Sequence, residues 1–328
     1  MKKKIFSLLI AMVAAATSVQ AQTITAVAPN GATTLYQSLP EAIKRADPGS
    51  ILYLPGGGFA IGDDDVITEK LTIMGIGHKS QNDNADGITT IVGGLRFNKG
   101  SDGSAVIGCY INDQVYIGSD GQVNDVLVKR CNLHSVDVNN AACTGTVISQ
   151  NYIRDDIFLS YSEATIKNNV IHGNNNYNAS IKEMSSGVIC NNIFLNTWRV
   201  SHIFHRITTA TITNNIICGW SYGPTSECGT LYTSGNAMIN NEWGDNPVKI
   251  EAEGWDAVFE KNGAANSNSN FHFKEAFKQY ERQVGIYAGD GFDDTQLAPT
   301  PRIVRKEIPD QTDAAGKLNI KIRVKASE

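Results

Sequence analysis

A short motif recurs about every 22 residues along the middle of the chain, and it restricts the fold more than any other feature. Each copy is a six-residue segment with an apolar start, a polar or small middle and an apolar end. The seven copies begin at Val106, Val128, Ile148, Ile166, Ile189, Ile212 and Met238, so successive starts are 22, 20, 18, 23, 23 and 26 residues apart. One such unit cannot bury its own inner face, so we expect the units to stack into a continuous core.

The residue types within the repeat indicate strands. Val and Ile dominate the apolar positions, Asn pairs and Gly interrupt them, and no Leu-rich ladder is present. Leucine-rich and helical solenoids are therefore disfavoured. The repeat predicts an all-β, single-stranded parallel β-helix in which equivalent side chains stack once per coil. We expect one such stack, which we call the asparagine file, to lie at the bend of each coil, with each side-chain amide hydrogen-bonded to the next. Its predicted members are Asn151, Asn169, Asn192, Asn215 and Asn241.

Both ends of the repeat are predicted to carry caps, as a solenoid requires. Ser38 and Glu41 form a capping box that opens a helix through Arg45, and this helix should cover the first coil. Two strands should follow, at Ile51–Leu54 and Lys70–Met74. After about residue 250 the repeat fades, and the expected elements are a short helix at Phe273–Arg282 and strands at Arg302–Ile308 and Lys317–Val324. The predicted organisation is a targeting segment at 1–21, the β-helix with its N-terminal cap at 22–250 and a capping tail at 251–328.

The first 21 residues have the pattern of a signal peptide. Lys2 to Lys4 are followed by an apolar stretch from Ile5 to Ala16 and by small residues before Gln22. No later stretch approaches the roughly 18 apolar residues of a membrane helix. We therefore expect an exported chain, located in the periplasm, at the cell surface or outside the cell, that does not span a membrane.

Charge and cysteine content limit the partners further. Without its three N-terminal lysines the chain carries 25 Lys and Arg against 33 Asp and Glu, a formal charge of −8. Nucleic acid is disfavoured because phosphate binding needs a basic face. Cys109 and Cys131 occupy equivalent repeat positions and are expected to be buried, stacked hydrophobes, whereas Cys218 and Cys228 could bridge a loop. A monomer that contacts a polysaccharide or another glycan is expected.

Two parts of the chain carry a family resemblance. Leu39–Ile43, Pro55-Gly56 and Leu71–Gly75 resemble the start of pectin-lyase-like β-helix proteins. Asn270–Phe273, Val284–Gly289 and Pro299–Ile303 are similar to the ending of secreted right-handed β-helix repeat proteins of glycan-degrading Gram-negative bacteria. The resemblance implies a right-handed solenoid and a carbohydrate-associated role. It does not imply one activity, because this fold hosts lyases, hydrolases and epimerases.

Polar residues cluster on neighbouring copies of the repeat. Lys182 and His205 both lie seven residues before an anchor, and Glu183 and Arg206 lie six before, so each pair should stack. β-Elimination on a uronic acid polymer needs a base and a positive charge at the carboxylate. We therefore interpret Lys182 as the base, Arg206 as the acid or charge stabiliser and His205 as an assistant; the Lys-then-Arg order resembles alginate and chondroitin lyases. The predicted substrate contacts are Tyr177, Glu183, Trp198, Arg199 and His202.

Other interpretations stay open at the level of sequence. The same residues fit a solvated polar face of a non-catalytic, glycan- or protein-binding protein. Hydrolysis by paired carboxylates could use Asp155 and Asp156, although adjacent strand residues point in opposite directions. No cofactor is indicated with certainty; Asp63–Asp65 and Asp290–Asp294 supply ligands that calcium accepts, and the histidines lack zinc spacing.

Overall fold

The structure is a computed structural model of the 328-residue chain. It describes residues 23–79, 87–173, 179–195, 202–218, 223–261, 270–297, 302–307, 309, 311–312, 315–318 and 320–325. The predicted targeting segment lies outside the described residues. None of the helices in this described part is long and apolar enough to cross a membrane.

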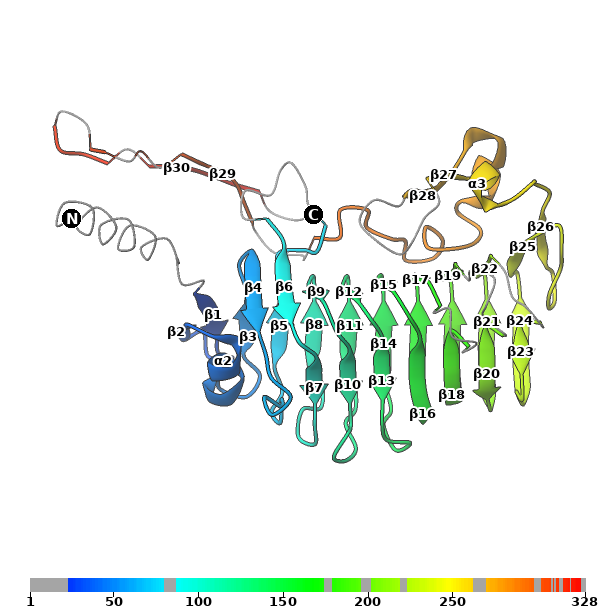
Figure 1. Cartoon of the computed structure of the whole chain (residues 1–328), viewed down its shortest axis with the longest axis horizontal. Coiled ribbons are helices and arrows are strands. Elements are labelled where there is room, and N and C mark those ends of the chain that lie inside the picture. The colour runs from blue at the N-terminus through cyan, green and yellow to red at the C-terminus, as the bar shows by residue number, and fades with distance from the viewer. Residues whose placement is uncertain are drawn as a thin grey trace, which may run out of the picture.

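The chain winds into a β-solenoid of about eight turns, built from parallel stacked sheets, as Figure 1 shows. One turn contributes three short strands, for example β8 (Ala105–Ile107), β9 (Tyr110–Ile111) and β10 (Val115–Ile117). Each pairs in parallel with its equivalents in the preceding and following turns. The predicted parallel β-helix is therefore confirmed.

The largest sheet has two strips. The β8 strip contains β3 (Ile51–Tyr53), β5 (Thr72–Met74), β8, β11 (Leu127–Lys129), β14 (Thr146–Ser149), β21 (Thr209–Thr213) and β24 (Thr230–Ser234). The β10 strip contains β7 (Leu95–Phe97), β10, β13 (Val136–Val138), β20 (Phe204–Ile207) and β23 (Thr225–Ser226). The long strands β16 (Ile157–Lys167) and β18 (Ile181–Cys190) run through both strips and join them.

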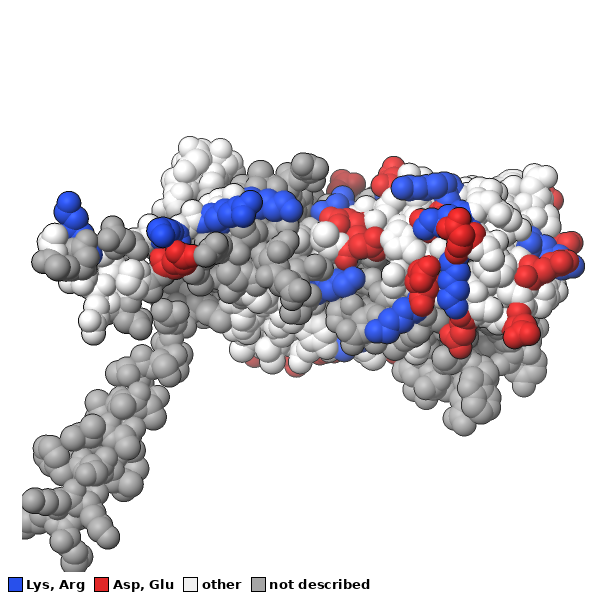
Figure 2. All heavy atoms as spheres, turned by 90° about the horizontal axis from the view of Figure 1, so that it is seen from above, with Lys and Arg blue, Asp and Glu red and all other residues white. Residues whose placement is uncertain are grey.

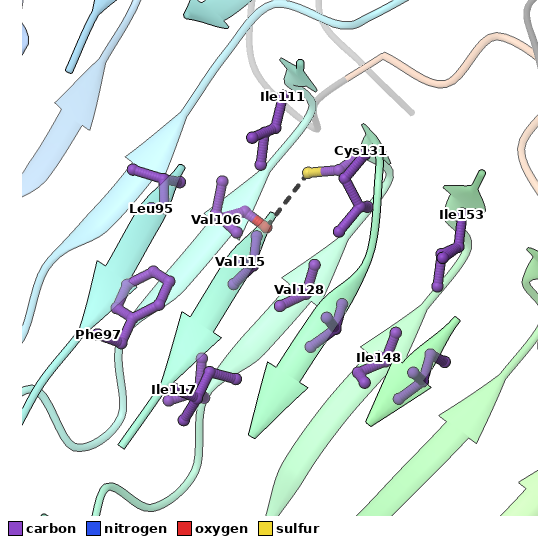
Figure 3. Close-up of a cluster of buried hydrophobic side chains, with 14 of the residues drawn as sticks. Leu95, Phe97, Val106, Ile111, Val115, Ile117, Val128, Cys131, Ile148 and Ile153 are labelled. Atoms are coloured by element: carbon purple, nitrogen blue, oxygen red, sulfur yellow. Dashed lines mark hydrogen bonds between the residues drawn. The ribbon is translucent and has the colours of Figure 1, made fainter. Parts of the chain in front are cut away.

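A ten-stranded sheet closes the remaining side of the coil. Its strands are β4 (Gly57–Ala60), β6 (Thr89–Val92), β9, β12 (Asn132–Leu133), β15 (Tyr152–Ile153), β17 (Val170–Ile171), β19 (Ile193–Phe194), β22 (Ile216–Ile217), β25 (Ala237–Ile239) and β26 (Val248–Ile250). Alternate residues of the strands point inward, and Figure 3 shows buried side chains of successive turns, such as Phe97, Val128 and Ile153, in this core. Burying such side chains contributes about 1.5–3 kcal/mol each.

The asparagine file is present, with one correction. The side chains of Asn169, Asn192 and Asn215 are fully buried, and each Nδ2 donates to the Oδ1 of the next Asn at 3.0 Å. The last member is Asn236, not Asn241, so the predicted register of the final copy was wrong by five residues. Ile212 pairs with Thr233 and not with Met238. A polar Thr at the usual apolar anchor position concealed the true register.

The left-handed bend lies one residue before the ladder asparagines. Asn168, Asn191 and Asn214 have φ of 53°, 57° and 56°, and Gly235 has φ of 66° at the same place in the last copy. The sequence prediction assigned this backbone to the ladder residues themselves. The two tasks are separated: one residue makes the bend, and the next reaches into the core and bonds along the axis.

Cys109 and Cys131 replace asparagine in the earlier coils. Both side chains are fully buried, as predicted, and the backbone N–H of Cys131 donates to Oδ1 of Asn151 at 2.9 Å. The Cys131 thiol lies 3.7 Å from the carbonyl oxygen of Val106 (Figure 3). Burial raises the pKa of Cys131 to about 12. All six cysteines lie in the described part of the chain and none is in a disulfide, so the suggested Cys218–Cys228 bridge is absent.

The terminal elements follow the predictions in outline. Helix α2 (Leu39–Arg45) is capped at its N-terminus by Ser38, whose Oγ accepts from the backbone N–H of Glu41 at 3.3 Å. It is preceded by the antiparallel strands β1 (Ile24–Val27) and β2 (Thr33–Tyr36). The expected helix near residue 280 is a 3-10 helix, η1 (Glu275–Tyr280), after α3 (Trp255–Val258), β27 (Phe259–Lys261) and β28 (Asn270–Phe273). Whether these elements act as caps stays a prediction.

The C-terminal tail returns along the solenoid and contacts the bend residues of successive coils (Figure 1). Asn168 Nδ2 donates to the carbonyl oxygens of Ile286 and Ala288 at 2.8 and 2.9 Å. One coil earlier, Gln150 Nε2 donates to the carbonyl oxygen of Gly291 at 3.0 Å. The chain ends with the antiparallel hairpin β29 (Arg302–Glu307) and β30 (Lys321–Lys325), close to the two strands expected there.

Candidate functional site

The outer face of the β10 strip carries one file of stacked side chains, which we call the outer ladder. Parallel pairing places these residues directly next to one another on successive turns, in the order Arg96, Tyr116, Asp137, Phe158, Lys182, His205 and Ser226. Neighbouring strands lie about 4.8 Å apart, so adjacent members can interact directly.

Side chains point alternately into the core and outward along each strand, and this alternation determines which residues belong to the ladder. Val136 and Val138 are fully buried in the core, so Asp137 between them points outward. In the same way, Ile181 is buried and Lys182 after it is partly exposed. The apolar residues that build the core therefore fix the position of each chemically active side chain.

Lys182 of the outer ladder forms an ion pair with Asp156, which lies beside the ladder. Lys182 Nζ lies 2.5 Å from Oδ2 of Asp156, and their side chains are only 21% and 11% exposed. Asp156 immediately precedes β16, and it belongs to the turn before that of Lys182. Burial raises the pKa of Asp156, and the hydrogen bond from Lys182 opposes that rise.

Asp137 lies on the adjacent turn, next to Phe158 in the parallel register. Burial raises the pKa of Asp137 to about 6, and the nearby Asp156 carboxylate adds to the rise. A hydrogen bond of 3.3 Å with the Ser135 hydroxyl orients one of its oxygens. Asp137 therefore retains its proton to a higher pH than an ordinary aspartate, so it can serve as a proton donor beside the Asp156–Lys182 pair.

Two aromatic rings flank Asp137 on the ladder. The Arg96 guanidinium lies over the Tyr116 ring, 4.1 Å from its centroid, and Lys182 Nζ lies 5.7 Å from the Phe158 centroid. Tyr116 and Phe158 are both partly exposed. Flat apolar rings next to acid–base groups are suited to stacking against a sugar ring.

The predicted lyase group forms two adjacent stacks. Lys182 pairs with His205 in the parallel register, as expected. Glu183 and Arg206 also stack, with 3.4 Å between Glu183 Oε1 and Arg206 Nη1, and Glu227 on the following turn lies 3.0 Å from Arg206 Nε. All three have left-handed backbone, with φ of 55°, 54° and 52°. Arg206 is thus positioned between two carboxylates.

The remaining predicted contacts divide into two groups. His202 is partly buried, and its Nδ1 lies 3.1 Å from the carbonyl oxygen of Gly223. Tyr177, Trp198 and Arg199 lie outside the described residues. Only His202 and Glu183 of the five predicted substrate contacts can therefore be placed.

A second acidic group borders the outer ladder. Asp155 Oδ2 lies 3.5 Å from His134 Nε2. Burial lowers the pKa of the nearby His172, and the Asp155 carboxylate opposes this change. Asp155 thus interacts with histidines, whereas Asp156 interacts with Lys182, so the two adjacent aspartates have different partners.

The acidic runs considered for calcium are engaged within the protein. Asp63 pairs with Arg96 at 2.6 Å, and Asp290 pairs with Lys167 at 2.5 Å. Asp294 accepts a hydrogen bond of 2.6 Å from the Tyr287 hydroxyl. Within the described ranges, no group of three or more His, Cys, Asp or Glu side chains is arranged to hold a metal ion.

Asp137 and Phe158 were missed because the sequence alignment covered only the six-residue segment around each asparagine bend. The last strand of each turn, which lies outside that segment, has its own apolar–variable–apolar pattern, seen at Val115–Ile117, Val136–Val138 and Ile157–Leu159. Alignment of this second pattern would have placed Tyr116, Asp137 and Phe158 in one file with Lys182.

Comparison of the chain with protein-family models, curated proteins and solved structures gave no match in any of the three. The arguments for function therefore rest on the solenoid and on the chemistry of the outer ladder.

Proposed function

We propose that the chain is an exported, carbohydrate-directed protein that cleaves a glycan on its outer ladder. The observation that carries the proposal is the position of Asp137 beside the Asp156–Lys182 ion pair, between Tyr116 and Phe158. The targeting pattern at the N-terminus and the resemblance to pectin-lyase-like proteins agree with a substrate outside the cell.

Glycoside hydrolysis is the reaction that this arrangement supports best. It requires one carboxyl group that donates a proton to the leaving oxygen and one carboxylate that activates water or attacks the sugar. Asp137, with its raised pKa, is suited to the first role, and Asp156, paired with Lys182, to the second. The two carboxyl groups come from neighbouring turns, which avoids the geometric objection to Asp155 and Asp156.

The charge balance favours a neutral glycan. The two cations that could bind the carboxylates of an acidic polymer here, Lys182 and Arg206, are already paired. Lys182 pairs with Asp156, and Arg206 pairs with Glu183 and Glu227. An acidic polymer would have to compete with these three carboxylates. The aromatic rings of Tyr116 and Phe158 impose no such cost on an uncharged sugar.

β-Elimination on a uronic acid polymer is the second candidate, and the parallel stacking of Lys182 with His205 favours it. Here Lys182 or His205 would remove the proton alpha to the carboxylate, and Arg206 would stabilise the resulting charge. The reaction requires that Lys182 be released from Asp156 when substrate binds.

A panel of neutral and acidic polysaccharides tests the proposal. Release of new reducing ends without ultraviolet absorbance indicates hydrolysis, and absorbance from unsaturated uronate indicates elimination. Asp137→Asn should lower kcat at least about 100-fold if Asp137 is the proton donor. Asp47→Asn, at an exposed aspartate beside helix α2, is the matched control and should have no effect.

The non-catalytic alternative predicts binding to glycans without any product. In that case Asp137→Asn would change affinity only slightly, because no proton transfer is involved, whereas Phe158→Ala would still weaken binding through loss of ring stacking. Turnover of no polysaccharide in the panel would overturn the enzymatic proposal.

A further inference from the structure

The last turn of the solenoid leaves part of its inner face open. Leu231 pairs with Ala210 of the preceding turn and occupies the same inward position, yet Ala210 is buried and Leu231 is only partly so. Leu231 lines a cavity of about 410 Å³ together with Cys228, Thr233 and Trp243. The Trp243 ring stacks on Phe204 at 5.6 Å between centroids and forms an apolar wall.

The strands of this turn also present an open edge. Within the described residues, β23 pairs only with β20, and β24 pairs only with β21, apart from a single bridge between Ser234 and Asp245. The backbone N–H of Thr230 donates to the carbonyl oxygen of Thr208, so the next amide along the strand, that of Leu231, points toward the open edge. An open strand edge beside the partly exposed Leu231 is a template for another strand.

The C-terminal hairpin has the complementary properties. Ile320, Ile322 and Val324 alternate along β30 and its approach, and they are 51%, 55% and 58% exposed. An isolated two-stranded hairpin is marginally stable in water, so an exposed apolar face on one indicates a partner.

Charge distinguishes the two surfaces. Residues 302–325 contain seven Lys and Arg against three Asp and Glu, whereas residues 225–261, around the open turn, contain two against seven. Figure 2 shows basic side chains along the hairpin at the left of the view and acidic ones near the last turns at the right. The two surfaces lie at opposite ends of the long axis, so one copy cannot join them within itself (Figure 1).

We propose that the hairpin of one copy docks on the open last turn of a second copy, with β30 extending the sheet at β24. Each copy then offers one hairpin and one open turn, so the contact is head-to-tail and produces chains of copies that grow with concentration. This departs from the monomer that the sequence led us to expect. The inference is independent of the proposed enzymatic function.

Sedimentation velocity over a concentration series tests the contact, using the chain from Gln22 onward. The wild type should form larger species as its concentration rises, and about 1 M salt, with a screening length of about 3 Å, should weaken them. Ile322→Glu should raise the dissociation constant at least about tenfold. Leu35→Glu, at an apolar residue of β2 that is 62% exposed, is the matched control and should leave association unchanged.

A mixing experiment identifies the two halves of the contact. Ile322→Glu retains the open turn and Leu231→Lys retains the hairpin, so each variant alone should be monomeric, and together they should form a 1:1 complex. Hydrogen exchange of the wild type supplies an independent readout, since residues 225–234 should become more protected as concentration rises. A wild type that stays monomeric at every concentration, a mixture that stays monomeric, or equal effects of Ile322→Glu and Leu35→Glu would each overturn the proposal.

Discussion

Side chains of strand β13 point alternately into the core and outward, and this alternation turns the carboxyl group of Asp137 outward, near the carboxylate of Asp156. Val136 and Val138 must point into the core, so Asp137 has no freedom to face elsewhere. Its neighbours on the ladder, Tyr116 on the preceding turn and Phe158 on the following one, shield the carboxyl group from water on two sides. The same strand packing that builds the core therefore holds Asp137 in a partly buried position, and this burial raises its pKa.

The pH dependence of stability should report this raised pKa. Folding moves the pKa of Asp137 from 3.8 to about 6, so between these values the native state retains a proton that the unfolded chain has released. Native stability contributed by this group therefore falls as the pH rises through that window. Asp137→Asn removes the cost of the buried charge and should stabilise the protein at pH 7 by about 1–2 kcal/mol, after allowance for partial solvent exposure.

Urea denaturation of wild type and Asp137→Asn near pH 4 and at pH 7 measures the effect. The difference in stability should be much smaller near pH 4, where the native carboxyl group is protonated and the unfolded one is only partly ionised. A difference that is the same at the two pH values would contradict the assignment, because it would show that the carboxyl group's charge is not involved.

The Asp156–Lys182 pair should show strong coupling. Lys182→Met leaves the Asp156 carboxylate buried without its partner and should cost about 3 kcal/mol. Asp156→Asn in the same protein removes the stranded charge and should recover most of that loss. A double-mutant cycle by urea denaturation measures the coupling energy, and a value near zero would mean that the ion pair does not form in solution.

At the scale of elements, the bend and the ladder residue perform separate tasks in every turn. Asn191 adopts the left-handed backbone, whereas Asn192 reaches the core and bonds to the asparagines above and below. Repetition of this pair aligns the turns, because a shift of one residue would bury the wrong side chain. The position of the outer ladder depends on this alignment.

Asn192→Ala tests the asparagine file. The Asn192 side chain accepts from the N–H and Nδ2 of Asn169 and donates to the carbonyl oxygen of Ile166 and to Asn215. Its loss leaves several buried groups without partners and should lower the free energy of unfolding by about 3 kcal/mol or more. Asn241→Ala is the control: Asn241 is exposed, so its replacement should change stability by less than about 0.5 kcal/mol.

Sequence patterns predicted the stack of turns but only part of the site. The Val and Ile anchors and the asparagine pairs gave the parallel strands, and equal distances from these anchors gave the Lys182–His205 stack. The Asp156–Lys182 contact was not predictable in this way, because it joins a residue before one strand to a residue inside the next turn's strand. The predicted register of the last copy of the repeat was wrong because Thr233 lies at the position where the other copies have an apolar anchor. Hydrophobic periodicity carries no information at a polar position.

At the scale of the whole molecule, stability comes from contacts between neighbouring turns, so position along the axis should determine local stability. Central turns have a strand on both sides, as β14 has between β11 and β16. Among the strands that the structure describes, most of β23 and β24 in the last turn has a neighbour on one side only.

Hydrogen exchange at low protein concentration should reveal this gradient. Amides of residues 146–149 should exchange slowest, close to the rate set by global unfolding, and those of residues 225–234 should exchange at least about 100-fold faster through local opening of the end turn. Leu231→Ala should accelerate exchange in the last turn without changing residues 146–149, because it removes packing only at the end. Equal protection of the two regions at low concentration would mean that the last turn is covered within a single copy, which would remove the structural basis for docking there.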